Sequence, residues 1–194
     1  MSKSVTQNNQ NNCESGAVLI SPHLSASSQV KSPLQLGVMA SGSGTNFAAV
    51  AKAIAQGKLN AEIKVLIYNN PRAKVKERAE EYHIPSVLLD HRAYQSRKDL
   101  DQKIVAVFKT YGVDWVIMAG WMRITTQVLL DGYPNRVINI HPSLLPSFKG
   151  IKAIEQALQA KVKITGCTVH LVSLEVDSGE IIMQAAVPVL RDDT

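Results

Sequence analysis

Cysteine is scarce in this chain, and its scarcity excludes two kinds of structural support. Only Cys13 and Cys167 occur among the 194 residues. Two cysteines cannot build a disulfide framework, and by themselves they cannot complete a structural zinc site. This usage is typical of a reducing compartment, so we predict a cytoplasmic protein that holds no metal.

Long apolar runs and blocks of like charge are also missing. No hydrophobic stretch approaches the roughly 20 residues of a membrane-spanning helix, and residues 1–15 lack the apolar core of a secretory signal. The formal net charge is +5, yet the basic residues are scattered. Scattered charge is typical of a solvated surface and suits anionic small molecules. We therefore expect small-molecule ligands, no nucleic acid and no membrane.

Residues 1–33 differ from the rest of the chain in composition. Asn, Gln and Ser dominate them, which predicts a poorly ordered polar extension. The apolar patch 17–20 is the one stretch of this extension able to dock on another surface. Residues 34–194 carry the hydrophobic periodicity of a folded domain.

Short apolar runs alternate with segments of helical spacing through most of this domain. Buried strands are predicted at 36–40, 63–68, 86–89, 115–119 and 136–140, and helices at 46–57, 73–83, 98–111, 125–130 and 151–160. Strands separated by helices form βαβ units and a parallel sheet. Two later alternating segments, 166–173 and 180–190, are expected to add further strands. The predicted fold is α/β, a Rossmann-like, open, mostly parallel twisted sheet with helices on both faces and C-terminal mixed or antiparallel strands.

The loop after the first predicted strand of the domain reads Ser-Gly-Ser-Gly-Thr-Asn. Small residues let backbone N–H groups approach an anion, and the following helix, capped by Thr45 or Asn46, favours negative charge. Gly42 and Gly44 match a dinucleotide-binding loop, but Phe47 stands at its third glycine position, and no lysine follows as in a P-loop. We predict a site for one phosphate monoester at Gly44, Thr45 and Asn46. A plain tight turn is the alternative.

The last strand of the parallel series ends in Asn-Ile-His-Pro. Asn139 and His141 are two residues apart, so their side chains leave the strand on the same side, and Pro142 keeps His141 extended. An amide N–H beside an imidazole suits oxyanion stabilisation and proton transfer during acyl transfer. The alternative is a pair of side chains that only satisfies a turn. Asp177 could reach His141 and favour its imidazolium form, whereas His170 is interpreted as structural or substrate-side.

An ordered set of motifs carries a resemblance to a known family. The motifs are Ser41-Gly42-Ser43-Gly44-Thr45-Asn46, Ala119-Gly120-Trp121-Met122-Arg123-Ile124, Asn139-Ile140-His141-Pro142-Ser143-Leu144-Leu145-Pro146, Thr165-Gly166-Cys167-Thr168-Val169-His170 and Asp177-Ser178-Gly179. Over about residues 36–189 they closely resemble the phosphoribosylglycinamide formyltransferases, the folate-dependent enzymes of purine synthesis. The resemblance implies a formyltransferase fold.

The resemblance also implies a reaction and its residues. A formyl group would pass from the co-substrate 10-formyltetrahydrofolate to the amine of 5′-phosphoribosylglycinamide in purine (IMP) biosynthesis, by a monomer or weak homodimer. The family's catalytic residues match Asn139, His141 and Asp177. Its phosphate-binding positions match Gly44, Thr45 and Asn46, and its folate-binding positions match Arg97, Met122, Arg123, Ile124, Thr125 and Asn139.

Three alternatives remain open. Methionyl-tRNA formyltransferase shares the Asn-x-His centre but needs a tRNA-binding domain, for which we expect no room in this chain. Formyltetrahydrofolate hydrolase, a related enzyme, lacks this glycine loop. Family members usually continue past the position of Thr194 with a helix that helps to hold the ribonucleotide. We therefore expect a formyltransferase domain at 34–194 without that helix, and a catalytically weak or silent ligand-binding form is the third alternative.

Overall fold

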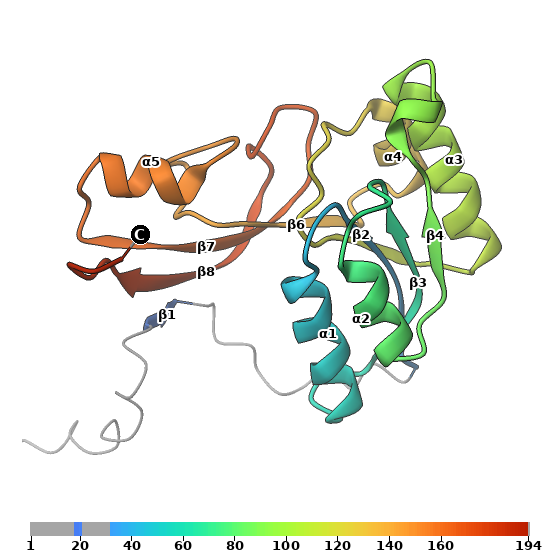
Figure 1. The fold of residues 1–194 in the computed structure, drawn as a ribbon, viewed down its shortest axis with the longest axis horizontal. Helices are drawn as coiled ribbons and strands as arrows, with labels where there is room; N and C mark the ends of the chain where they lie inside the picture. Colours follow the sequence, from blue (N-terminus) through green and yellow to red (C-terminus); the bar gives the residue numbers. More distant parts are fainter. Residues whose placement is uncertain (1–17, 21–31, 194) are drawn as a thin grey trace, which may run out of the picture.

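The computed structural model describes residues 18–20 and 32–193, whose strands form one twisted sheet (Figure 1). The strands are β1 (Val18–Ile20), β2 (Leu34–Ala40), β3 (Ala61–Tyr68), β4 (Ser86–Leu88), β5 (Trp115–Met118), β6 (Val137–His141), β7 (Ile164–Leu171) and β8 (Ile181–Pro188). Their order in the sheet is β1-β8-β7-β6-β5-β2-β3-β4. The five strands from β6 to β4 run parallel, and β7, β8 and β1 are added antiparallel. The predicted mostly parallel sheet with antiparallel C-terminal strands is confirmed.

Strand β1 lies at the edge of the sheet and pairs with β8. Val18 is opposite Ala186, and Ile20 is opposite Gln184, in an antiparallel register. Residues 18–20 of the apolar patch noted in the sequence therefore pair with the sheet of the folded domain. The rest of the predicted polar extension, residues 1–17 and 21–31, lies outside the described residues.

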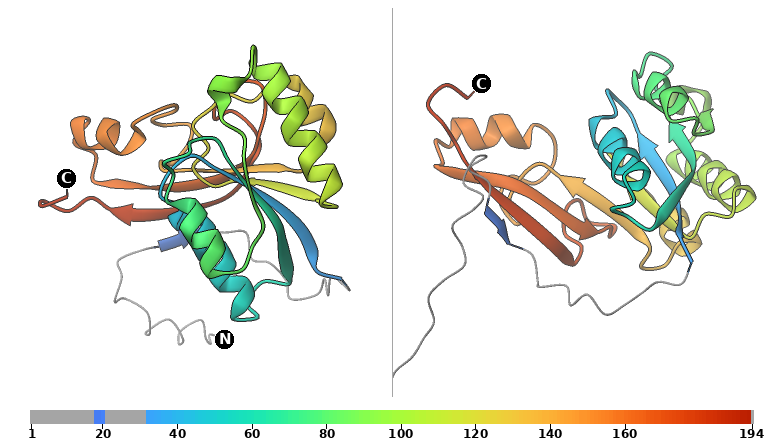
Figure 2. Two further views of the ribbon diagram at one scale, coloured as in Figure 1. Left: turned by 45° about the vertical axis from the view of Figure 1, so that its right-hand side comes forward. Right: turned by 90° about the horizontal axis from the view of Figure 1, so that it is seen from below.

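Helices lie on both faces of the parallel part of the sheet (Figure 2). On these faces lie α1 (Thr45–Ala55), α2 (Val75–Glu81), α3 (Arg97–Thr110) and α4 (Gln127–Gly132). Helix α5 (Ala153–Gln159) lies instead beside the antiparallel strands β7 and β8, and a 3₁₀ turn, η1, spans His91–Ala93. Helices α1 and α2 pack on one face through Phe47 and Val75. Helices α3 and α4 pack on the other face through Phe108 and Leu129. None of the helices in the described parts of the chain is long and apolar enough to cross a membrane.

Strand β2 shows why the hydrophobic runs of this sequence are continuous. Val38 faces α1 and α2, and the next residue, Met39, faces α3 and α4, so both sides of the strand are buried. Each such side chain stabilises the fold by about 1.5–3 kcal/mol. Gly37 leaves space for Phe108, because a Cβ atom there would lie 2.6 Å from Cε1 of that ring. Strand β2 is packed on both faces by these two cores, which fixes the position of its last residue and thus of the loop that follows.

Candidate active site

The predicted site residues lie at the carboxyl ends of neighbouring parallel strands. Strand β5 lies between β2 and β6 in the sheet. The segments that follow these strands, 41–46, 119–126 and 142–150, therefore begin at one edge of the sheet. In open parallel sheets this is the edge at which ligands bind.

The carboxylate of Asp177 joins two histidines and an asparagine in one cluster. Its Oδ2 lies 3.2 Å from Nδ1 of His141, and its Oδ1 lies 3.6 Å from Nε2 of His170. Nδ2 of Asn139 lies 3.5 Å from the same Oδ1. The backbone N–H of Gly150 donates to Oδ2 over 2.8 Å. Because the Asp177 side chain is only 9% exposed, these contacts act in a medium less polar than water.

His141 is buried and has an acceptor at each ring nitrogen. Nδ1 faces the carboxylate of Asp177, and Nε2 lies 2.9 Å from the carbonyl oxygen of Phe148. Neither oxygen can donate a hydrogen bond, so at each of these contacts the ring nitrogen has to be the donor. The site therefore holds a histidine that can donate from Nε2 to a substrate oxygen that replaces the Phe148 carbonyl.

His170 orients the side-chain amide of Asn139. Nδ1 of His170 lies 2.8 Å from the carbonyl oxygen of Leu171, so this nitrogen carries a proton. In the neutral ring Nε2 is then an acceptor, and it receives a hydrogen bond from Nδ2 of Asn139 over 3.1 Å. The N–H₂ group of Asn139, rather than its oxygen, is thereby directed toward the cluster. These contacts agree with the structural interpretation of His170.

Thr168, on β7, holds the turn that follows His141. Its hydroxyl donates to the carbonyl oxygen of Ser143 over 2.7 Å and accepts from the backbone N–H of Leu145 over 3.1 Å. Nε2 of Gln184, on β8, donates to the same hydroxyl oxygen over 3.0 Å. Sequence reasoning gave no role to Gln184 or to Thr168, although Thr168 lies in one of the quoted motifs, since a Thr or Gln within a strand carries no local sign of a tertiary contact.

The variant Thr168→Val is expected to lose about 1–3 kcal/mol of unfolding free energy. Valine keeps the shape of threonine, but it leaves the buried carbonyl of Ser143 without its donor and the N–H of Leu145 without its acceptor. Urea unfolding curves measure the difference. Thr110→Val is the control, because that exposed hydroxyl bonds only to the carbonyl oxygen of Ala106 in its own helix among the described residues. Equal stability of wild type and Thr168→Val would contradict the assigned contacts.

Gly44 ends the loop after β2 and precedes helix α1. Its φ of 74° and ψ of 27° place it in the left-handed region, which favours glycine. No side chain within the described part of the chain caps the helix, which corrects the expectation that Thr45 or Asn46 does so. The first N–H groups of α1, which include those of Thr45 and Asn46, therefore have neither an intrahelical partner nor a capping side chain. The predicted phosphate site is a helix N-terminus with donors available to an anion.

The segment between β5 and α4 is tied to this glycine loop. The backbone N–H of Met122 donates to Oγ of Ser41 over 2.9 Å, and the N–H of Ser41 donates to the carbonyl oxygen of Gly120 over 3.1 Å. Met122 and Ile124 are 73% and 53% exposed, so their apolar side chains are available to a ligand. Thr125, by contrast, is buried.

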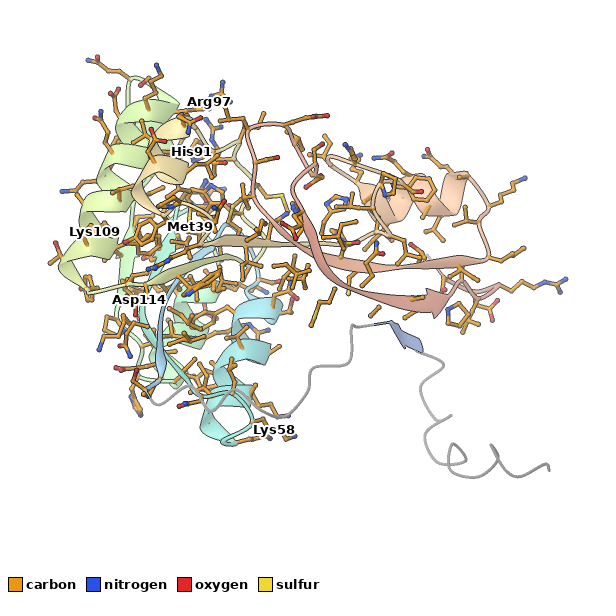
Figure 3. All side chains as sticks on the ribbon, turned by 180° about the vertical axis from the view of Figure 1, so that it is seen from behind. Met39, Lys58, His91, Arg97, Lys109 and Asp114 are labelled. Carbon is orange, nitrogen blue, oxygen red and sulfur yellow. The ribbon has the colours of Figure 1, made fainter. Side chains whose placement is uncertain are left out.

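The start of α3 reaches the same segment. Arg97 is exposed in the first turn, at the opposite end of α3 from Lys109 (Figure 3). One turn further, Oδ2 of Asp101 accepts from the N–H of Thr126 over 2.6 Å and from its hydroxyl over 2.8 Å. In the same segment, Nε of Arg123 is buried without a hydrogen-bond partner among the described residues. Asp101 thus fixes the end of the segment predicted to bind folate.

The variant Asp101→Asn is expected to change how stability depends on pH. Burial raises the pKa of the Asp101 carboxyl above its ordinary value of 3.8, although the hydrogen bonds from Thr126 and the charge of Arg97 act to lower it. The folded protein then holds this proton more tightly than the unfolded chain. The stabilising contribution of Asp101 is therefore present below pH 3.8 and is lost as the pH rises through the raised pKa.

Asparagine cannot ionise, and its Oδ1 can accept both Thr126 hydrogen bonds. Asp101→Asn should therefore gain stability relative to the wild type as the pH rises above about 4. Urea unfolding at a series of pH values measures this difference. Asp131→Asn, an exposed carboxyl on α4, is the control. A stability difference for Asp101→Asn that does not vary with pH would be evidence against a raised pKa.

The structure brings some of the predicted residues together and leaves others apart. Asn139, His141 and Asp177 form one cluster, and the glycine loop contacts the 119–126 segment. Among residues 18–20 and 32–193, no hydrogen bond joins the cluster directly to the glycine loop. In that part of the chain no group of three or more His, Cys, Asp or Glu side chains is placed to hold a metal ion.

Comparison with known proteins places this geometry in a family. Residues 34–194 match the family model described as formyl transferase. The chain belongs to the formyl transferase family. It is 40% identical over 160 residues to phosphoribosylglycinamide formyltransferase of Bacillus subtilis, a match that covers 82% of each chain.

Two further members show the extent of the similarity. The trifunctional purine biosynthetic protein adenosine-3 of Homo sapiens is 40% identical over 164 residues, which are 84% of this chain but only 16% of that longer protein. The crystal structure of glycinamide ribonucleotide transformylase 1 from Symbiobacterium toebii has a TM-score of 0.82 and 44% identity, over 84% of this chain and 76% of that one. The family match includes β7, β8 and the Asp177 turn, whereas β1 lies outside it.

Proposed function

We propose that this chain transfers a formyl group from 10-formyltetrahydrofolate to the amine of 5′-phosphoribosylglycinamide, a step of purine (IMP) biosynthesis. The observation that carries the proposal is the cluster of Asn139, His141 and Asp177 at the carboxyl end of β6. Membership of the formyl transferase family supports it, as does the Bacillus subtilis relative, whose name is that of this activity. Formyl folate enters as a co-substrate.

The cluster suits the tetrahedral step of formyl transfer. The lone pair of the substrate amine attacks the formyl carbon, a new C–N bond forms, and the carbonyl electrons move onto the formyl oxygen. The Asn139 amide and Nε2–H of His141 would stabilise that oxyanion, with His141 releasing the Phe148 carbonyl. Collapse of the intermediate breaks the bond to N10 of the folate. The amine loses a proton and N10 gains one, and His141, held by Asp177, is placed to relay it.

The two substrates are assigned to the two linked segments. The phosphate is assigned to the start of α1, where backbone donors lack partners, at Gly44, Thr45 and Asn46. The folate is assigned to the exposed apolar segment beside it and to its neighbours, which are Arg97, Met122, Arg123, Ile124, Thr125 and Asn139. The hydrogen bonds of Ser41 to Gly120 and Met122 support a shared site, because they hold the two segments side by side.

One assay separates the candidate functions. The protein is incubated with 10-formyltetrahydrofolate and either glycinamide ribonucleotide or water alone, and loss of the formyl group is followed. Loss that requires the ribonucleotide supports the proposal. Loss in water alone indicates a hydrolase, and no loss under either condition indicates a silent ligand-binding form.

The oligomeric state and the compartment are further parts of the proposal. We propose a monomer or a weak homodimer that works in the cytoplasm; the scarcity of cysteine supports the compartment. Sedimentation velocity over a range of protein concentrations measures the oligomeric state, and a stable tetramer or larger assembly would contradict the proposal. Imaging of the tagged full chain in its own cell measures the compartment.

A further inference from the structure

Helix α2 holds two consecutive carbonyl oxygens of the glycine loop. The backbone N–H of Val75, the first residue of α2, donates to the carbonyl oxygen of Gly42 over 3.1 Å. Nε of Arg78, one turn further along, donates to the carbonyl oxygen of Ser43 over 2.7 Å. The loop is therefore anchored to a second helix, besides the one that it begins.

These two bonds fix the direction of two backbone N–H groups. Both peptide groups are trans, and in a trans peptide the C=O and N–H groups point in opposite directions. With the carbonyls of Gly42 and Ser43 turned toward α2, the N–H groups of Ser43 and Gly44 are turned away from it. Together with the unpaired N–H groups at the start of α1, they form a set of donors for an anion.

The packing of α2 leaves Arg78 on the loop and free of competing carboxylates. A Cβ atom on Gly44 would lie 2.4 Å from Cγ2 of Val75, so α2 approaches the backbone of the loop only because this residue is glycine. Among the residues that the structure describes, Arg78 forms no ion pair, whereas Lys76 of the same helix lies 3.5 Å from Glu80. The guanidinium of Arg78 therefore bonds to the carbonyl oxygen of Ser43 without a carboxylate competing for it among the described residues.

We propose that Arg78 is a positioning residue that preorganises the loop for the substrate phosphate. The inference rests on the proposed function and adds to it a residue that lies outside the loop. Without the guanidinium, the Ser43–Gly44 peptide is free to rotate, and its N–H is no longer held away from α2. Binding a phosphate must then order the loop as well, which lowers affinity for ligands that carry a phosphate and for no others.

The test compares Arg78→Met and Arg78→Lys with the wild type. For glycinamide ribonucleotide, Arg78→Met should raise KM about tenfold while kcat stays within about twofold, as expected for one lost hydrogen bond from a charged donor. Arg78→Lys keeps a charged donor, so its KM should rise less than that of Arg78→Met. For the dephosphorylated nucleoside, kcat/KM should be unchanged. Ribose 5-phosphate, titrated by calorimetry, should bind Arg78→Met about tenfold more weakly.

The matched control is Lys76→Met, which removes one positive charge from the same helix without touching the loop. It should bind ribose 5-phosphate like the wild type. Equal losses in Arg78→Met and Lys76→Met would assign the effect to net charge and overturn the proposal. The proposal would also be overturned if Arg78→Met lost kcat/KM equally for the ribonucleotide and the nucleoside. Unchanged binding of ribose 5-phosphate by Arg78→Met would overturn it too. Because the calorimetry needs no turnover, absence of formyl transfer in the wild type would refute the proposed function without deciding the role of Arg78.

Discussion

Replacing His141 by alanine is expected to lower kcat for formyl transfer by about 10²–10⁴-fold, the usual contribution of a general acid–base group. In the cluster formed with Asn139, His170 and Asp177, the ring of His141 lies against the carboxylate through Nδ1, and its Nε2 is the donor best placed for the formyl oxygen. In the proposed mechanism, alanine at this position removes both the stabilisation of the oxyanion and the proton relay. Steady-state kinetics with both substrates measure the change, which should appear in kcat more than in KM.

The control for this variant is another histidine outside the cluster. His83 is exposed after α2 and has a φ of 54°, a backbone conformation that asparagine tolerates. His83→Asn should therefore transfer formyl groups at the wild-type rate. A kcat near the wild-type value in a folded His141→Ala protein would show that His141 is not a catalytic residue.

Asp177→Asn has the second largest expected effect, a fall of about 10²-fold in kcat, within the range of general acid–base contributions. The neutral amide can still accept from the N–H of Gly150, and asparagine tolerates the φ of 50° at this position. What it removes is the negative charge that lies 3.2 Å from Nδ1 of His141. Nδ1 of His141 then loses its hydrogen bond to a charged acceptor in a buried place, so the unfolding free energy should also fall by up to about 3 kcal/mol.

Glu175→Gln is the matched control, since this carboxylate lies in the same turn, is 79% exposed and, among the described residues, pairs with Lys149 alone at 3.7 Å. It should leave both kcat and stability close to the wild type. The double variant of His141→Ala with Asp177→Asn adds a second check. If Asp177 acts through His141, the double variant should be no slower than His141→Ala alone. Fully additive losses would show that Asp177 has a separate role.

Much of the fold was predictable because its causes are local. Continuous apolar runs predicted the parallel strands, and helical spacing predicted the helices between them, since in a doubly covered sheet both faces of a strand such as β2 are buried. The alternating pattern near the C-terminus predicted β7 and β8. Pairing of β1 with β8 had no such signal beyond a short apolar patch, because an edge pairing depends on which edge is left open.

The sequence by itself determined the strand end that carries Asn139 and His141, because residues two apart on a strand share a face, and it determined the glycine loop, because backbone approach to an anion requires small residues. Only the tertiary structure decided that Asp177 meets His141, and that Arg78 holds the loop through Ser43. Both contacts join residues 35 or 36 positions apart in the chain. Local patterns record what a residue does to its neighbours in sequence, whereas these partners are chosen by the order and packing of the strands and helices between them.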